Sequence, residues 1–244
     1  MRKILTAITI MMSVAGCATH DPILPGDRTA IFDTANIKIL NQPIPNAPKN
    51  AGAADAGDCP YTQDASNVIW HGDKKIFSGF PTSNMVGGER HPVCSGAFLY
   101  VGLTTGEVVK INAKTHQVAW VADVYRPSNM TGGSSVLDIV APVVVAGDAV
   151  YAGGLGDAVC RMNAASGAKT WCTDIGTGVP MLVVDNVVYV TATDGNLYAM
   201  NAKNGDVYWR QPVRAQETPI LANGIVRVGR QCMNASTGDG TPCD

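Results

Sequence analysis

The chain has little charge and no excess of basic residues. Charged residues make up 16% of its 244 positions, and the formal net charge at pH 7 is -2. Proteins that bind nucleic acid neutralise phosphates with clustered lysine and arginine side chains, which this composition does not provide. We therefore expect no nucleic-acid partner.

The sequence also lacks the usual motifs of metal and haem chemistry. Its seven cysteines include no Cys-x-x-Cys motif and no adjacent pair. Four histidines, namely His20, His71, His91 and His116, show no spacing typical of metal ligands. The sequence accordingly predicts no metal site, and we expect no cofactor.

Long apolar runs are scarce, and the longest lies at the N-terminus. Arg2 and Lys3 precede an apolar run from Ile4 to Val14, which is shorter than the roughly 20 residues of a membrane-spanning helix. A short basic region followed by such a run predicts a signal peptide over residues 1–16. No second run is long enough to span a bilayer.

The end of this run resembles the lipobox of bacterial lipoproteins. Small residues, Val14-Ala15-Gly16, stand directly before Cys17. The resemblance implies that Cys17 is acylated and anchors the protein. Ala18 is not acidic, which implies transfer to the outer membrane with the protein facing the periplasm. A cleaved secretory signal with an incidental cysteine is the alternative.

The remaining six cysteines are even in number, as expected of disulfides in an exported protein. In "CRMNAASGAKTWC" a turn around Ser166 places Cys160 opposite Cys172 on neighbouring strands. Six cysteines allow fifteen pairings, and hairpin geometry favours Cys160 with Cys172 and Cys232 with Cys243. This leaves Cys59 with Cys94, and all six are interpreted as structural.

Composition divides the chain after the signal peptide. Residues 17–60 are rich in Pro, Asn, Ala and Gly and predict a flexible tether, with one short strand-like piece at Asn36–Leu40. Residues 61–244 are predicted to form the folded domain.

The folded domain repeats one pattern. Tyr, a glycine-bearing turn, Asn-Ala and Trp recur in register over three segments: Tyr100–Trp120, Tyr151–Trp171 and Tyr189–Trp209. A shortened fourth copy follows Pro219, and the four Asn-Ala pairs begin at Asn112, Asn163, Asn201 and Asn234. Strands apolar on both faces need covering by neighbouring sheets. The pattern therefore predicts an all-β β-propeller of four-stranded antiparallel blades, with four to five blades or an incomplete ring.

This repeat, best kept from Gly195 to Trp209, resembles the one shared by pyrroloquinoline-quinone dehydrogenases and the BamB outer-membrane assembly lipoproteins. Resemblance to the BamB family implies a non-enzymatic periplasmic scaffold that assists insertion of β-barrel proteins into the outer membrane. It also implies a partner subunit of the Omp85/BamA type and no cofactor. That family has eight blades, whereas this chain has room for four or five.

A quinoprotein or another ligand-binding propeller lipoprotein is the alternative function. Such dehydrogenases often have adjacent cysteines, a Ca²⁺ site and a catalytic carboxylate. Adjacent cysteines do not occur here, and four aspartates fall in turns, where they usually cap amides: Asp157, Asp185, Asp194 and Asp239. We expect no catalytic residue.

A partner-binding segment is predicted on the longest connection between repeats, Tyr125 to Pro142. Long loops on a rigid scaffold commonly carry function. Within this one, Val136, Leu137 and Ile139 are apolar and flank Asp138. They form either an exposed contact patch or an extra buried strand, and we predict the contact patch.

Overall fold

The computed structural model describes residues 37–51, 59–82, 86–124, 136–156 and 158–243, all within the compact unit Thr34–Asp244. The named strands of these residues pair antiparallel within their sheets, which confirms the predicted all-β propeller architecture. Cys17 and Asp157 lie outside the described residues. Among the described residues no helix is long and apolar enough to cross a membrane.

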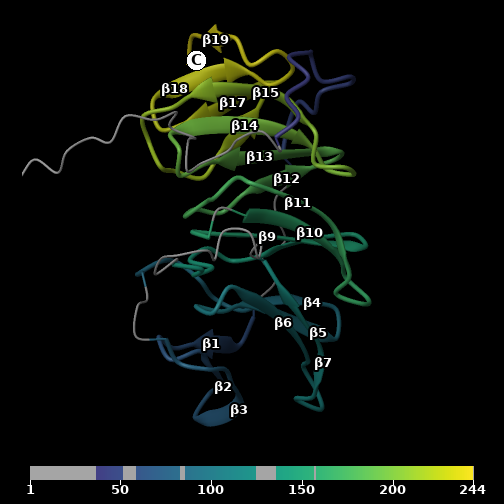
Figure 1. The fold of residues 1–244 in the computed structure, drawn as a ribbon, viewed down its shortest axis with the longest axis vertical. Coiled ribbons are helices and arrows are strands. Elements are labelled where there is room, and N and C mark those ends of the chain that lie inside the picture. Colours follow the sequence, from purple (N-terminus) through teal and green to yellow (C-terminus); the bar gives the residue numbers. More distant parts are fainter. Residues whose placement is uncertain (1–36, 52–58, 83–85, 125–135, 157, 244) are drawn as a thin grey trace, which may run out of the picture. The chain divides into compact units, whose positions relative to one another are not determined.

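Five sheets follow one another in chain order, and we call them blades 1 to 5 (Figure 1). Blade 1 contains β1 (Tyr61–Gln63), β2 (Val68–His71) and β3 (Lys74–Ser78). Blade 2 contains β4 (Val93–Ser95), β5 (Phe98–Gly102), β6 (Glu107–Asn112) and β7 (Val118–Asp123). Blade 3 contains β8 (Val144–Ala146), β9 (Ala149–Gly154), β10 (Ala158–Asn163) and β11 (Lys169–Thr173). Blade 4 contains β12 (Leu182–Val184), β13 (Val187–Thr191), β14 (Asn196–Asn201) and β15 (Val207–Pro212). Blade 5 contains β16 (Ile220–Ala222), β17 (Ile225–Val228), β18 (Gln231–Asn234) and β19 (Gly240–Thr241).

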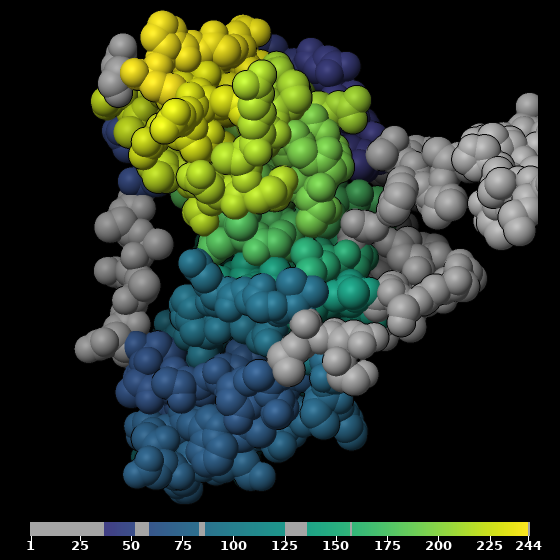
Figure 2. Space-filling model, turned by 90° about the vertical axis from the view of Figure 1, so that its left-hand side faces the viewer, coloured from purple at the N-terminus to yellow at the C-terminus, as the bar shows by residue number. Residues whose placement is uncertain are grey.

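The core lies between neighbouring blades. Strands β9 and β13 are buried along their whole length because each has a blade on both sides. Four apolar clusters join blades 1 and 2, 2 and 3, 3 and 4, and 4 and 5. None of these clusters of described residues joins blade 1 to blade 5. The colours of Figure 2 follow the same order, from blue through teal and green to yellow.

Part of the predicted tether is docked on the folded body. Residues 38–40 add to the outer edge of β15, where Ile39 pairs in parallel with Val207. Farther along, the Ile44 amide donates to Ser236 O over 2.9 Å, and Ile44 is buried in the cluster between blades 4 and 5. Residues 37–51 lie beside these two blades in Figures 1 and 2. This stretch is therefore a docked segment of the folded body.

The six cysteines form three disulfides: Cys59–Cys94, Cys160–Cys172 and Cys232–Cys243. Cys160 is directly opposite Cys172 in the β10–β11 ladder, as the turn around Ser166 predicts. Cys59–Cys94 links the start of blade 1 to β4 of blade 2. Two disulfides thus fasten strands within a blade, and one fastens two blades together.

Candidate interaction surface

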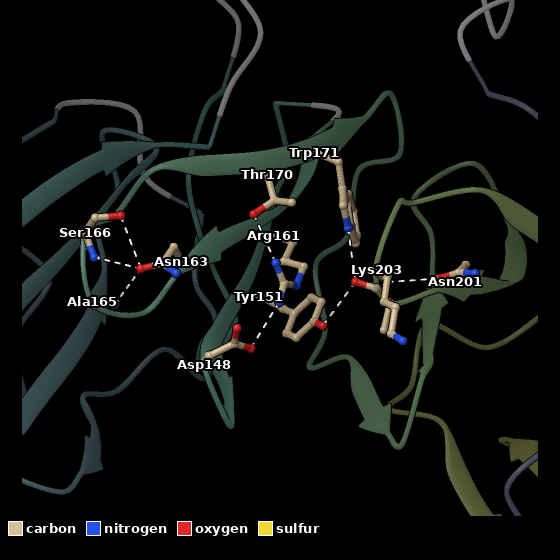
Figure 3. Close-up of polar contacts among 11 residues, drawn as sticks. Asp148, Tyr151, Arg161, Asn163, Ala165, Ser166, Thr170, Trp171, Asn201 and Lys203 are labelled. Atoms are coloured by element: carbon tan, nitrogen blue, oxygen red, sulfur yellow. Dashed lines mark hydrogen bonds and ion pairs between the residues drawn. The ribbon is translucent and has the colours of Figure 1, made fainter.

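The Asn-Ala turns are built by the asparagine side chain. In blade 3, Asn163 Oδ1 accepts hydrogen bonds from the amides of Ala165 and Ser166, both over 3.0 Å (Figure 3). The turn is closed by the Gly167 amide, which donates to Asn163 O over 2.8 Å. An asparagine is therefore required because its short side chain satisfies amides that the turn leaves unpaired.

Each turn also receives the aromatic side chains of the preceding blade. Trp171 Nε1 and the Tyr151 hydroxyl both donate to Ala202 O, over 3.1 and 3.2 Å, and Figure 3 shows the two side chains converging on blade 4. Tyr189 reaches Ala235 O of blade 5 in the same way, over 3.2 Å. Three side chains of the repeat, Tyr151, Trp171 and Tyr189, thus donate hydrogen bonds that fasten one blade to the next. The buried Nε1 of Trp209 has no hydrogen-bond partner among the described residues.

Between blades 2 and 3 a lysine takes the place of the tyrosine. Lys110 is buried, and its Nζ donates to Ala164 O over 2.7 Å, beside the Trp120 Nε1 donor at 3.2 Å. The ammonium group also lies 3.9 Å from the centre of the Phe98 ring. Burial lowers the pKa of Lys110 below its usual value. The carbonyl and the ring compensate for that burial, which gives Lys110 a structural role.

Two further buried ionisable groups, the hydroxyls of Tyr198 and Tyr189, are also hydrogen-bonded. Burial, followed by the 2.6 Å hydrogen bond that its hydroxyl donates to Asp194, raises the pKa of Tyr198 to about 12. Burial also raises the pKa of Tyr189. Both hydroxyls therefore stay protonated at neutral pH and serve as donors. Asp194 additionally caps the Asn196 amide over 3.0 Å.

Val136–Ile139 was predicted to be an exposed contact patch, and this prediction is wrong for two of its four residues. Asp138 and Ile139 are 0% exposed, whereas Val136 and Leu137 are half-buried. Ile139 fills the space beside Gly102, where an added Cβ would lie 2.4 Å from its Cγ2 atom. The segment forms no regular strand either, so neither interpretation of the sequence describes it.

Asp138 is buried because it has an ion partner that the sequence did not indicate. The Arg90 guanidinium donates to its carboxylate over 2.8 Å, and the Val86 amide donates over 2.9 Å. Nothing in the sequence pairs positions 90 and 138, since the contact depends on how the connections entering blades 2 and 3 pack.

Of the exposed large apolar side chains among the described residues, two lie on the outer strand β7, and the others, Phe80, Val86 and Ile220, lie outside it. Val118 and Val121 of β7 are 44% and 50% exposed. No group of three His, Cys, Asp or Glu side chains suited to a metal lies within the described ranges. The feature of this surface best suited to recognition is therefore the outer edge of blade 2. Its signal in the sequence is the strand "VAWVAD", which has no basic residue.

Five sheets in series, four of which carry the Asn-Ala turn of the repeat, define a repeat protein of the β-propeller class. A family model described as outer membrane protein assembly factor BamB matches residues 50–211 and 156–242. The chain belongs to this BamB family.

Curated relatives carry the same name. BamB of Moranella endobia is 26% identical over 149 residues, which cover 60% of this chain and 38% of the relative. BamB of Burkholderia pseudomallei is 33% identical over 98 residues, which cover 36% of this chain and 23% of the relative. The matched part of the chain thus spans less than two fifths of either relative.

Solved structures share the fold. The crystal structure of BamB from Moraxella catarrhalis matches with a TM-score of 0.51 and 18% identity, covering 79% of this chain and 65% of that one. A quinohemoprotein alcohol dehydrogenase from Pseudomonas putida matches with a TM-score of 0.56 and 16% identity, covering 80% and 42%. At these identities the likeness concerns the fold alone, which serves both classes of protein.

Proposed function

We propose that this protein is a non-enzymatic scaffold in the assembly of β-barrel proteins into the outer membrane. The observation that carries the proposal is the match to the BamB family from residue 50 to residue 242. The names of the relatives describe an assembly factor of outer membrane proteins. Because the chain spans a minority of their length, their activity is transferred here as a proposal.

The contacts between blades suit a scaffold. Four side chains direct their polar atoms to carbonyls of the next blade: Tyr151, Tyr189, Trp171 and Lys110. These groups fix the spacing and orientation of the blades, so that outer edges and connections are held in constant positions. A rigid framework of this kind lowers the entropy lost when a partner binds.

We further propose that the protein is anchored in the outer membrane through a lipid on Cys17 and faces the periplasm. The docked segment begins at Ile37, twenty positions after Cys17. Twenty residues span at most about 70 Å when fully extended. The blades would then work within that distance of the bilayer surface.

The proposed partner is the barrel-inserting subunit of the Omp85/BamA type. In-cell cross-linking of the full-length protein, followed by identification of what is captured, tests this proposal. We expect recovery of that subunit. Recovery of respiratory proteins or of bound quinone instead would contradict the scaffold role and favour the quinoprotein alternative.

A further inference from the structure

The outer strands of blades 2, 3 and 4 present three versions of one sheet edge. β7, β11 and β15 each follow an Asn-Ala turn and carry a register shift at the same place in the ladder. Six positions after the turn asparagine, the three strands therefore have equivalent residues. These are Val118 (112 + 6), Lys169 (163 + 6) and Val207 (201 + 6).

The blade 4 edge is already occupied by an extended segment. The Val207 amide donates to Lys38 O over 2.9 Å, and Val207 O accepts the Leu40 amide over 2.8 Å. Val207 belongs to the apolar cluster between blades 3 and 4, against which Ile39 also packs, and its exposed fraction is 0%. This position of the repeat can therefore hold an added strand through its main chain.

The outer edges of blades 1 and 3 carry charge. Lys169 stands at the equivalent position of β11 and is exposed. β3, the outer strand of blade 1, begins with Lys74 and Lys75, which are also exposed. Lysine on an edge strand opposes pairing with another chain, because an incoming strand would have to cover the charge.

Among the described residues, none adds a strand to the blade 2 edge, and this edge has no lysine. Within the described part of the chain β7 pairs with β6 alone, and its six residues include no Lys, Arg or Pro. Val118 is 44% exposed, although its equivalent Val207 is completely covered. We propose that the outer edge of β7 binds an extended, unpaired segment of an unfolded β-barrel protein, adding it to blade 2 as residues 38–40 add to blade 4. This inference rests on the proposed function.

The chemistry of the edge favours this occupant. Main-chain pairing tolerates many sequences, while Val118 and Val121 require apolar side chains opposite them. Strands of membrane β-barrels alternate apolar and polar residues, and before insertion they are unpaired. Folded soluble domains, in contrast, usually protect their edge strands with charge.

Photo-cross-linking tests the proposal. Benzoylphenylalanine would be placed in the full-length chain at Val121 in β7 or, as a control, at Thr170, an exposed position of the lysine-bearing strand β11. The probe is an eight-stranded outer-membrane barrel protein diluted from urea. We expect at least tenfold more cross-linking from position 121 than from position 170. Equal yields, equal capture of the folded barrel, or cross-links only between copies of this chain would overturn the proposal.

Two substitutions, one that adds a lysine and one that removes a lysine, test whether the strand edge is the binding site. Val118→Lys copies the residue of β11 and should lower the yield at position 121 about tenfold without changing the melting temperature. Lys169→Val should create a second site and raise the yield at position 170. An unchanged yield in Val118→Lys would overturn the edge as the site.

The same variant separates this inference from the proposed function. If Val118→Lys still binds the unfolded probe as well as the unmodified chain does, the edge proposal fails, while in-cell capture of the barrel-inserting subunit would still support the scaffold. If the edge binds the probe but the unmodified protein captures no assembly subunit, the scaffold proposal fails and the edge remains a strand-binding site.

Discussion

At the scale of single residues, two turns of the repeat show why glycine occupies the fourth position after the asparagine. An added Cβ at Gly167 would lie 2.7 Å from Trp120 of the preceding blade, and one at Gly205 would lie 2.9 Å from Trp171. Both glycines also have a positive φ, of +74° and +76°. Glycine is required here by the backbone conformation and by the indole that covers it.

Gly167→Ala should therefore lower the free energy of unfolding by about 2–4 kcal/mol, through left-handed strain and overpacking against Trp120. His116 provides the control, since it holds the same turn position in blade 2 with a φ of +59°. His116→Gly relieves that strain and should not destabilise. Urea titration measures both variants, and a loss below about 0.5 kcal/mol for Gly167→Ala would contradict the packing.

The buried ion pair leads to a second prediction. Arg90→Ala removes the guanidinium from a carboxylate that is fully buried, so we expect a loss of about 3–5 kcal/mol in unfolding free energy. Lys38→Ala is the matched control, because the Lys38–Asp206 pair is exposed on the lysine side and should contribute about 1 kcal/mol or less. Equal effects of the two changes would argue against a buried role for Asp138.

At the scale of elements, residues 37–51 of the predicted tether form a docked segment of the folded body. Ile44→Ala should destabilise by about 2–5 kcal/mol, because a buried side chain is lost from the cluster between blades 4 and 5. The Leu40 and Ile44 amides should exchange slowly with solvent in the unmodified protein. Lys49→Ala, at an exposed side chain, is expected to change little. Rapid exchange of both amides would show that the segment is undocked.

Three disulfides cross-link segments within and between the blades. Peptide mapping without reduction should recover Cys59–Cys94, Cys160–Cys172 and Cys232–Cys243. Replacing both Cys160 and Cys172 by Ala should cost about 3 kcal/mol, the loop-entropy expectation for cysteines 12 positions apart. A different set of linked peptides would refute the hairpin registers.

The sequence predicted the elements that carry the repeat and missed those held by long-range contacts. Blades 2 to 5 are marked by Asn-Ala turns, and the Cys160–Cys172 register follows from local turn chemistry. Blade 1 has no such turn between β2 and β3, although Tyr61 still donates to Ala113 O over 2.9 Å. The docked segment and the Arg90–Asp138 pair depend on packing between distant residues, which no local pattern records.

At the scale of the whole molecule, the blades form a series of nearest-neighbour interfaces. Each apolar cluster joins consecutive blades, so stability should be close to a sum of blade and interface contributions. Blade 5 departs from the repeat on its far face. Arg227 stands opposite Cys232, where blade 4 has Tyr189 opposite Ala199. Arg227 is exposed, so this face of blade 5 is polar where blade 4 has a buried tyrosine.

The central claim, that this family member supports assembly of the outer membrane, is tested most directly by the amount of folded β-barrel protein in that membrane. The measurement compares cells with and without the gene, and cells that regain it. We expect folded barrel proteins to decrease when the gene is absent and to recover when the unmodified chain is supplied. Unchanged levels of folded barrel protein in its absence would contradict the scaffold function.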